Sequence, residues 1–337
     1  MTMKTGTRLG LICGLTALIA LVIWQGIGEI TAALTAAGWG LLLVTVFHLL
    51  PMLSSSLCWR GLFPAEYRPS LPRLLQARWI GESINGLLPV AQIGGELAKA
   101  RWMMHHKIPG SVAGASVVVE LTITLMTQIL FTLIGLALLL LQLEPGLNLV
   151  LSIILGIVAI GALLFIFYSA QRQRFFSKIA HLVNHIAGGR EWLSMSGGAD
   201  QLDTAIEHIY GNKKVLAIAS AWRLLSWIVG TGEVWLLMYF LGTPISLAEA
   251  LLLESLGQAI RAAGFLIPAS LGIQEGGFLL LGAVLGIPPH TALALSLGKR
   301  IRELILGLPG LLVWQFAIGQ RLWQRRQVEQ ATESGSL

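Results

Sequence analysis

Charged side chains inside apolar sequence are the residues of this chain whose types and spacing could carry chemistry. They are glutamates, arginines and lysines, with a few amides beside them, in stretches otherwise rich in Leu, Ala, Val and Gly. An ionised group in the hydrocarbon core of a membrane costs at least about 2.5 kcal/mol, so such residues mark either buried ion pairs or a polar pathway. The candidate substrate-binding residues are Glu82, Asn85, Gln92, Glu96, Arg101, Glu120, Arg261, Gln274, Glu275, Lys299, Arg300, Arg302 and Glu303.

The pathway interpretation assigns a role to each kind of group. Cations and the N-terminal ends of short helices would hold a phosphate or another polar head group in a water-filled cavity. The glutamates would couple to protons or act as gates. The alternative is that the same charges form structural ion pairs, which fix the helices and transport nothing.

The composition places these charges in a membrane. Of the 337 residues, 55% are hydrophobic and 12% are charged, and the mean hydropathy is +0.75, whereas soluble domains carry roughly 25% charged residues. About 20 apolar residues in a helix are enough to cross the hydrocarbon. We therefore expect a single all-α membrane domain over 1–337, with six transmembrane helices near 7–26, 38–58, 110–142, 147–169, 214–241 and 290–319.

Lysine and arginine are unevenly distributed along the chain. The segments near 27–37, 143–146, 242–247 and 287–289 contain neither, whereas most of the 23 fall in segments that alternate spans place on one side. Because positively charged loops stay in the cytoplasm, both termini are predicted to be cytoplasmic. The net charge of +6 then reflects topology and contact with anionic lipid head groups, and we expect no nucleic-acid partner.

An internal repeat surrounds several of the candidate residues. The stretches are LLPVAQIGGELAKA at 87–100 and LIPASLGIQEGGFL at 266–279, and Pro268 and Glu275 each lie 179 positions after Pro89 and Glu96. Each copy predicts a helix, a break at Pro and Gly, and a second helix, within 72–104 and 246–286. Neither helix is long and apolar enough to span a membrane, so we expect two re-entrant helical hairpins whose tips are buried in protein or face water.

The flanking charges orient the two hairpins oppositely. Arg78 and Lys99 flank the first hairpin, which predicts that it opens from the cytoplasm, whereas the second has uncharged flanks. Extending each unit to the neighbouring spans gives a first repeat at 38–142 and a second, inverted repeat at 214–319. Inverted repeats with broken helices are the architecture of many secondary transporters.

The repeat also suggests partners for the buried charges. Arg261 and Lys299 lie 179 positions after Glu82 and Glu120, so opposite charges occupy equivalent positions and are expected to meet near the symmetry axis. Lys299, Arg302 and Glu303 would share one helical face close to the membrane midplane.

The remaining segments carry less information. Residues 170–213 predict a cytoplasmic amphipathic linker on the membrane surface, and 320–337 a disordered cytoplasmic tail. The sequence has no nucleophile elbow, P-loop or zinc motif, so we expect no enzyme activity, catalytic residue, metal or cofactor.

Two long motifs resemble a known family. NGLLPVAQIGGELAKAR, followed by Glu120, and PASLGIQEGGF with IPPHTALALSLGKRIRELILGLPGLLVWQ look like the transmembrane region of lysylphosphatidylglycerol synthases, a flippase-like family. The second block resembles its hopanoid-biosynthesis-associated branch. One departure is Leu121, where many relatives carry an arginine after the acidic residue. The residues that match the motifs are Pro89, Gly95, Glu96, Arg101, Pro268, Gly272, Glu275, Arg300 and Glu303.

The resemblance implies a multi-pass protein of the bacterial cytoplasmic (inner) membrane that handles lipids. Its partners would be hopanoid, phospholipid or polyprenyl-phosphate lipids, together with hopanoid-biosynthesis proteins. Two hypotheses remain open: a lipid transporter with a charged midplane cavity between the hairpins, and a non-transporting scaffold for hopanoid-biosynthesis enzymes. A third, an intramembrane enzyme acting on a lipid head group, lacks a reactive constellation.

Overall fold

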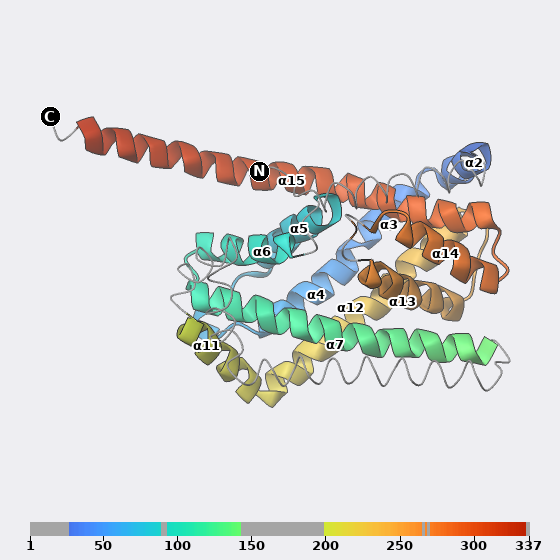
Figure 1. The fold of residues 1–337 in the computed structure, drawn as a ribbon, viewed down its shortest axis with the longest axis horizontal. Coiled ribbons are helices and arrows are strands. Elements are labelled where there is room, and N and C mark those ends of the chain that lie inside the picture. The colour runs from blue at the N-terminus through green and yellow to red at the C-terminus, as the bar shows by residue number, and fades with distance from the viewer. Residues whose placement is uncertain (1–26, 89–92, 143–198, 265–266, 268–269, 335–337) are drawn as a thin grey trace.

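The computed structural model describes residues 27–88, 93–142, 199–264, 267 and 270–334, which are drawn in colour in Figure 1. The described part of the chain is helical and contains no strand. Its first half comprises α2 (Ile27–Ala37), α3 (Gly40–Phe47), α4 (Leu49–Gly61), a short 3₁₀ turn (Ala65–Tyr67), α5 (Leu71–Leu87), α6 (Gly94–His105) and α7 (Gly110–Gln142). Its second half comprises α11 (Ala199–Gly211), α12 (Lys213–Phe240), α13 (Leu247–Ala263), α14 (Ile273–Val284) and α15 (Pro289–Ser334).

Three helical stretches are long and apolar enough to cross a membrane: Gly40–Gly61, which joins α3 and α4, Gly110–Leu141 in α7, and Lys213–Phe240 in α12. They confirm the prediction of an all-α integral membrane protein. The predicted span at 290–319 falls within α15, where charged residues interrupt the apolar sequence. The predicted spans at 7–26 and 147–169 lie outside the described residues, so the six-span count stays a prediction.

The helices follow the same pattern twice, with the 179-residue offset of the sequence motifs. Gly94–His105 and Ile273–Val284, the bounds of α6 and α14, match residue for residue under this offset. The starts of α7 and α15, at Gly110 and Pro289, match as well, as do the ends of α4 and α12 at Gly61 and Phe240. How the two units face a membrane stays a prediction.

Prolines and glycines set the break and the close packing in each helix pair. Leu88, just before Pro89, is extended with φ −108° and ψ 147°, because proline disfavours helical backbone in the residue that precedes it. Gly272 has φ +78° at the start of α14, a conformation that glycine adopts without strain. In the first pair, a Cβ on Gly95 would lie 2.1 Å from the carbonyl oxygen of Gly81, so α5 and α6 cross at a point where only glycine fits.

The two long helices α7 and α15 hold the helix pairs together. Helix α7 packs against α6 and α13, and α15 packs against α14 and α5, so each long helix contacts one arm of each pair. Helices α4 and α12 cross between the pairs, with α5–α6 toward one end of α7 and α13–α14 toward the other (Figure 1). Two apolar cores result, one around α4, α5, α6, α7 and α11, the other around α3 and α12–α15.

The linker and the tail are partly described. Helix α11 forms the end of the predicted linker at 170–213 and packs on α7, whereas the amphipathic stretch that motivated the linker lies outside the described residues. The structure continues α15 to Ser334, where the sequence predicts a disordered tail.

Candidate functional site

The first group of buried charges joins the first helix pair to α7. Glu120 on α7 accepts hydrogen bonds from Arg78 on α5 and from Lys99 on α6, the latter at 2.8 Å. Lys99 also pairs with Glu96 at 2.7 Å and lies 5.0 Å from the ring centre of Trp59. Arg78, Lys99 and Glu120 are each at most 4% exposed. We call Arg78, Glu96, Lys99 and Glu120 the first cluster.

A second cluster joins the second helix pair to α15, and two of its ion pairs have the opposite sign pattern to the first cluster. Lys299 on α15 donates to Glu254 on α13 at 2.5 Å, and Arg300 donates to Glu275 on α14 at 2.8 Å. In the first cluster the long helix supplies the carboxylate, whereas in these two pairs it supplies the cations. A third pair, between Arg261 on α13 and Glu303 on α15, keeps the sign pattern of the first cluster. Both Lys299 and Glu275 are almost fully buried. The second cluster consists of Glu254, Arg261, Glu275, Lys299, Arg300 and Glu303.

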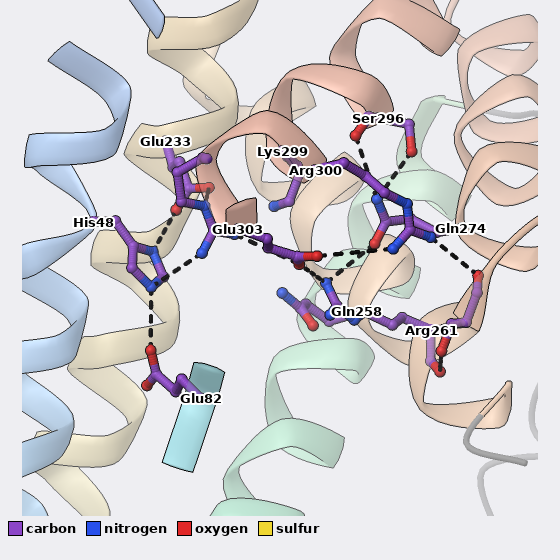
Figure 2. Close-up of polar contacts among 12 residues, drawn as sticks. His48, Glu82, Glu233, Gln258, Arg261, Gln274, Ser296, Lys299, Arg300 and Glu303 are labelled. Carbon is purple, nitrogen blue, oxygen red and sulfur yellow. Dashed lines mark hydrogen bonds and ion pairs between the residues drawn. The ribbon is translucent and has the colours of Figure 1, made fainter. Parts of the chain in front are cut away.

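Polar side chains extend the second cluster between its three helices. Arg261 on α13 pairs with Glu303 and donates to the Gln274 amide oxygen at 3.1 Å. The Gln274 amide nitrogen donates to Ser296 Oγ at 2.9 Å, and Ser296 donates to Glu275 at 3.3 Å. Figure 2 shows this chain of contacts running from α13 through α14 to α15. A network in which every buried group has a partner is rigid, because breaking one bond leaves its neighbours unsatisfied.

A central cluster of His48, Glu82, Glu233 and Arg302 joins the two halves. His48 lies between α3 and α4, and its Nδ1 is 2.8 Å from Glu233 Oε2 on α12. Its Nε2 is 3.1 Å from Arg302 Nη1 on α15 and 3.4 Å from Glu82 Oε2 on α5. Arg302 also pairs with Glu233 at 2.9 Å. Glu303 lies between this cluster and the second one in Figure 2, since it contacts Arg261 and approaches Arg302 to 4.0 Å.

Comparison with known proteins identifies the family. The family described as the lysylphosphatidylglycerol synthase TM region matches residues 10–310. The chain belongs to this family. It is therefore a multi-pass membrane protein of a lipid-related family. No match was found among curated proteins, and none among solved structures.

The structure brings most of the predicted site residues of this family member into the three clusters. Glu82 and Arg302 lie in the central cluster, Glu96 and Glu120 in the first, and Arg261, Gln274, Glu275, Lys299, Arg300 and Glu303 in or beside the second. Asn85 has a different position, because its side-chain oxygen accepts from the Gly95 N–H at 2.7 Å and so fixes the crossing of α5 and α6. Arg101 is exposed on α6. Gln92 lies outside the described residues.

The expected ion pairs between symmetry-equivalent positions do not form. Glu82 faces His48 and Arg78, and Arg261 pairs with Glu303. Glu120 likewise pairs within the first cluster and Lys299 within the second. The reason is geometric: equivalent residues of a two-fold arrangement meet only on its axis, and these residues contact the helices of their own half instead.

Several residues of the clusters were not among the predicted site residues. Their polarity within apolar sequence could have identified them: Glu233 and Glu254 are carboxylates inside apolar helices, and His48 is a histidine in the middle of a predicted span. Arg78 and Lys99 were assigned to the cytoplasmic flanks of the first hairpin, but each is only 4% exposed and bonded to Glu120. Their positive charge therefore balances a carboxylate and no longer argues for a cytoplasmic opening.

The chemistry of the clusters is electrostatic. Within the part of the chain that the structure describes, no three His, Cys, Asp or Glu side chains come together as a metal site. The arginines present planar N–H donors suited to carboxylates and phosphates, and each arginine of the three clusters already pairs with a glutamate. The arrangement can bind an anion by exchanging it for one of these carboxylates.

Proposed function

We propose that this protein transports lipids across a bacterial inner membrane, by passing a polar or phosphate-bearing head group between two helix pairs that act as gates. The observation that carries the proposal is the arrangement of buried charge. Each helix pair is fastened to a long helix by its own ion cluster, and a third cluster joins the halves. So many charged residues within membrane-spanning segments are rare in membrane proteins that have no transport pathway.

The energetics of buried ion pairs favour exchange of partners. The attraction within such a pair roughly offsets the cost of removing both ions from water, whereas a single unpaired ion in the interior costs about 3–5 kcal/mol. A cluster is therefore stable when closed and unstable when opened without a substitute. A head-group phosphate can take the place of a carboxylate on an arginine, because both present two oxygens to the guanidinium fork.

The packing of the long helices links the two gates. Helix α7 touches α6 of the first pair and α13 of the second, and α15 touches α5 and α14. Movement of one pair away from its long helix therefore changes the packing of the other pair. We propose that the pairs are re-entrant hairpins of an inverted repeat, which open alternately to the two sides of the membrane.

The lipid is proposed from the chemistry of the site and from the family. The cations of the clusters suit a phosphate-bearing head group, and the hopanoid-associated motifs suggest hopanoids or a related polar lipid as cargo. Phospholipids and polyprenyl phosphates carry such a phosphate in their head groups, so they are the first alternatives to test.

The experiment is leaflet exchange in proteoliposomes that contain the purified full chain. Fluorescent phosphatidylglycerol is the probe, and a membrane-impermeant quencher reports the fraction in the outer leaflet. We expect Arg302→Gln to slow exchange at least about tenfold, the equivalent of about 1.4 kcal/mol of lost interaction, whereas Glu66→Gln, at an exposed position, leaves it unchanged. Folded wild-type protein that exchanges neither this probe nor a labelled hopanoid would refute the proposal.

One observation favours a second candidate, a membrane scaffold for hopanoid-biosynthesis enzymes. The buried carboxylates Glu120, Glu254 and Glu275 already face cations, so the clusters also suit a static structural role. A scaffold predicts that hopanoid-biosynthesis enzymes co-purify with the protein and that Arg302→Gln, if folded, still retains them. Exchange by the wild type that is lost in Arg302→Gln would exclude a purely structural role.

A further inference from the structure

His48 occupies a position in the fold where its ring reaches both halves of the molecule. It lies within the Gly40–Gly61 span, where the backbone N–H of His48 donates to Val44 and its carbonyl accepts from Met52. Pro51 follows one turn later and cannot donate to the carbonyl of Phe47, which accounts for the interruption between α3 and α4. The ring is 16% exposed and points at Glu233 and Glu82 (Figure 2), and its Nε2 also contacts Arg302.

The three contacts of the ring cannot all be made in one protonation state. A neutral imidazole has one N–H and one bare nitrogen, and an ionised carboxylate only accepts. The 2.8 Å contact with Glu233 therefore places the proton of the neutral ring on Nδ1. Nε2 is then bare and accepts from Arg302 Nη1 at 3.1 Å, so that it has nothing to donate to Glu82 at 3.4 Å.

Protonation of the ring changes the hydrogen-bond partner of Nε2 from Arg302 to Glu82. A proton added to the lone pair of Nε2 makes this nitrogen a donor, which matches the Glu82 carboxylate and opposes the donor on Arg302. The bond of the ring to α15 in the second half is exchanged for a bond to α5 in the first helix pair. The step is a simple proton addition and needs no other reactant.

We propose that His48 is the proton-binding site of the transport cycle: the neutral ring holds Arg302, and the protonated ring holds Glu82 and frees an N–H of Arg302 for an oxygen of an anionic head group. This inference rests on the proposed function and adds its coupling ion. The side chain of Glu82 has room to move toward or away from the ring, since it is 42% exposed, whereas the side chain of Glu233 is 4% exposed. Glu82 lies in the last part of α5, five residues before the helix ends at Leu87.

Charged groups surround the His48 ring from the helices that pack against α3 and α4. The nearest of these groups are two carboxylates, Glu82 and Glu233, and one cation, Arg302. Glu82 is itself approached by Arg78 at 4.0 Å, and Arg302 by Glu303 at 4.0 Å. The groups are Arg78 and Glu82 on α5, Glu120 on α7, Arg223 and Glu233 on α12, and Lys299, Arg302 and Glu303 on α15.

The first test reads the ring directly, without transport. Full-length protein with ¹⁵N-labelled histidine is reconstituted in lipid bilayers, and the signal missing from His48→Gln is assigned to His48 by NMR. We expect the Nδ1–H tautomer at alkaline pH and a doubly protonated ring at acid pH. Glu82→Gln should move the midpoint to lower pH, since it replaces a charged acceptor with a neutral amide. His208→Gln, at an exposed site on α11, should leave the His48 signal unchanged.

Two NMR results would overturn the proposal. One is the Nε2–H tautomer at alkaline pH, and the other is a His48 signal that does not titrate between about pH 5 and pH 9, a range that brackets the ordinary histidine value. If His48→Gln does not fold, His48→Asn serves for assignment, because an asparagine amide occupies the place of Nδ1 and keeps a donor to Glu233.

The second test separates this inference from the proposed function. Leaflet exchange of fluorescent phosphatidylglycerol is measured from acid to alkaline pH. We expect the wild-type rate to change severalfold across the His48 midpoint and the His48→Gln rate to be flat. A variant with the wild-type pH profile would refute the proton site while leaving lipid transport intact. Absence of exchange of both this probe and a labelled hopanoid in folded wild-type protein would refute transport, and the NMR titration would still decide whether His48 switches between Arg302 and Glu82.

Discussion

Replacing Glu120 with leucine is the most direct probe of the first cluster. The substitution keeps a side chain of similar size and removes the carboxylate that accepts from both Arg78 and Lys99. Two cations that are each 4% exposed then lose their shared partner. Because the change removes one side of buried ion pairs, we expect a loss of stability and not a neutral exchange.

The remaining contacts of Arg78 and Lys99 determine how much stability the Glu120→Leu variant loses. Lys99 keeps Glu96 at 2.7 Å, and Arg78 keeps the carbonyl of Ser55 at 3.0 Å and Glu82 at 4.0 Å. The loss is therefore toward the lower end of the range for broken buried pairs, about 3 kcal/mol. At about 2–4 °C per kcal/mol for larger domains, the thermal midpoint in detergent should fall by about 6–12 °C.

A triple variant without the three buried ions provides the control. Glu120→Leu combined with Arg78→Met and Lys99→Met removes these ions together and leaves only the more exposed Glu96 of the cluster, and well-packed apolar replacements for buried pairs are often neutral or stabilising. Thermal denaturation followed by fluorescence-detected size exclusion measures each midpoint. The reasoning is refuted if Glu120→Leu alone melts within about 1 °C of wild type, or if the triple variant melts no higher than the single one.

Two further predictions follow from the helix pairs. Gly95→Ala places a Cβ 2.1 Å from the carbonyl oxygen of Gly81, so we expect it to separate α5 from α6 and to lower the thermal midpoint by several degrees. The control is Gly86→Ala, which has nothing within 4 Å of its Cβ and should leave the midpoint unchanged or raise it. Equal midpoints for the two alanine variants would argue against the glycine crossing. Lys299→Met leaves Glu254 buried without its 2.5 Å partner and should destabilise by about 3 kcal/mol, and adding Glu254→Gln should recover at least half of the lost midpoint; no recovery in the double variant would contradict the pairing.

The helix pattern was predictable from the sequence because it depends on local chemistry. Proline removes a backbone donor and constrains the residue before it, and glycine allows close approach, so the motifs around Glu96 and Glu275 mark helix breaks wherever the rest of the chain lies. The apolar runs around Val44, Val119 and Val234 marked spans for a similar reason, since helix length and hydrocarbon thickness are fixed quantities. These features require no knowledge of which helices are neighbours.

The partners of the charges were not predictable in the same way. Glu120 and Lys299 are equivalent in the repeat, yet each is bonded within its own half, because partner choice depends on which helix faces pack together. Arg78 appears in the sequence as one more basic residue at the flank of the first hairpin, and only the packing of α5 against α4 and the bond from Arg78 to Glu120 on α7 show that it is buried. His48 has no charged residue within ten positions along the chain, so its three ionic neighbours become visible only in three dimensions.

The different sign patterns of the two clusters bear on how the proposed transport would proceed. When the first helix pair leaves α7, the moving arms carry the cations Arg78 and Lys99, and the carboxylate of Glu120 stays on the long helix. When the second pair leaves α15, Glu254 and Glu275 move together with the cation Arg261, and Lys299 and Arg300 stay on the long helix together with Glu303. An anionic head group would thus be held by a moving gate on one side and by a fixed helix on the other. Two clusters of the same sign pattern would hold it in the same way on both sides, so the difference would give the two openings different affinities. A proton gradient acting through His48 would then supply the free energy that sets the direction of the cycle.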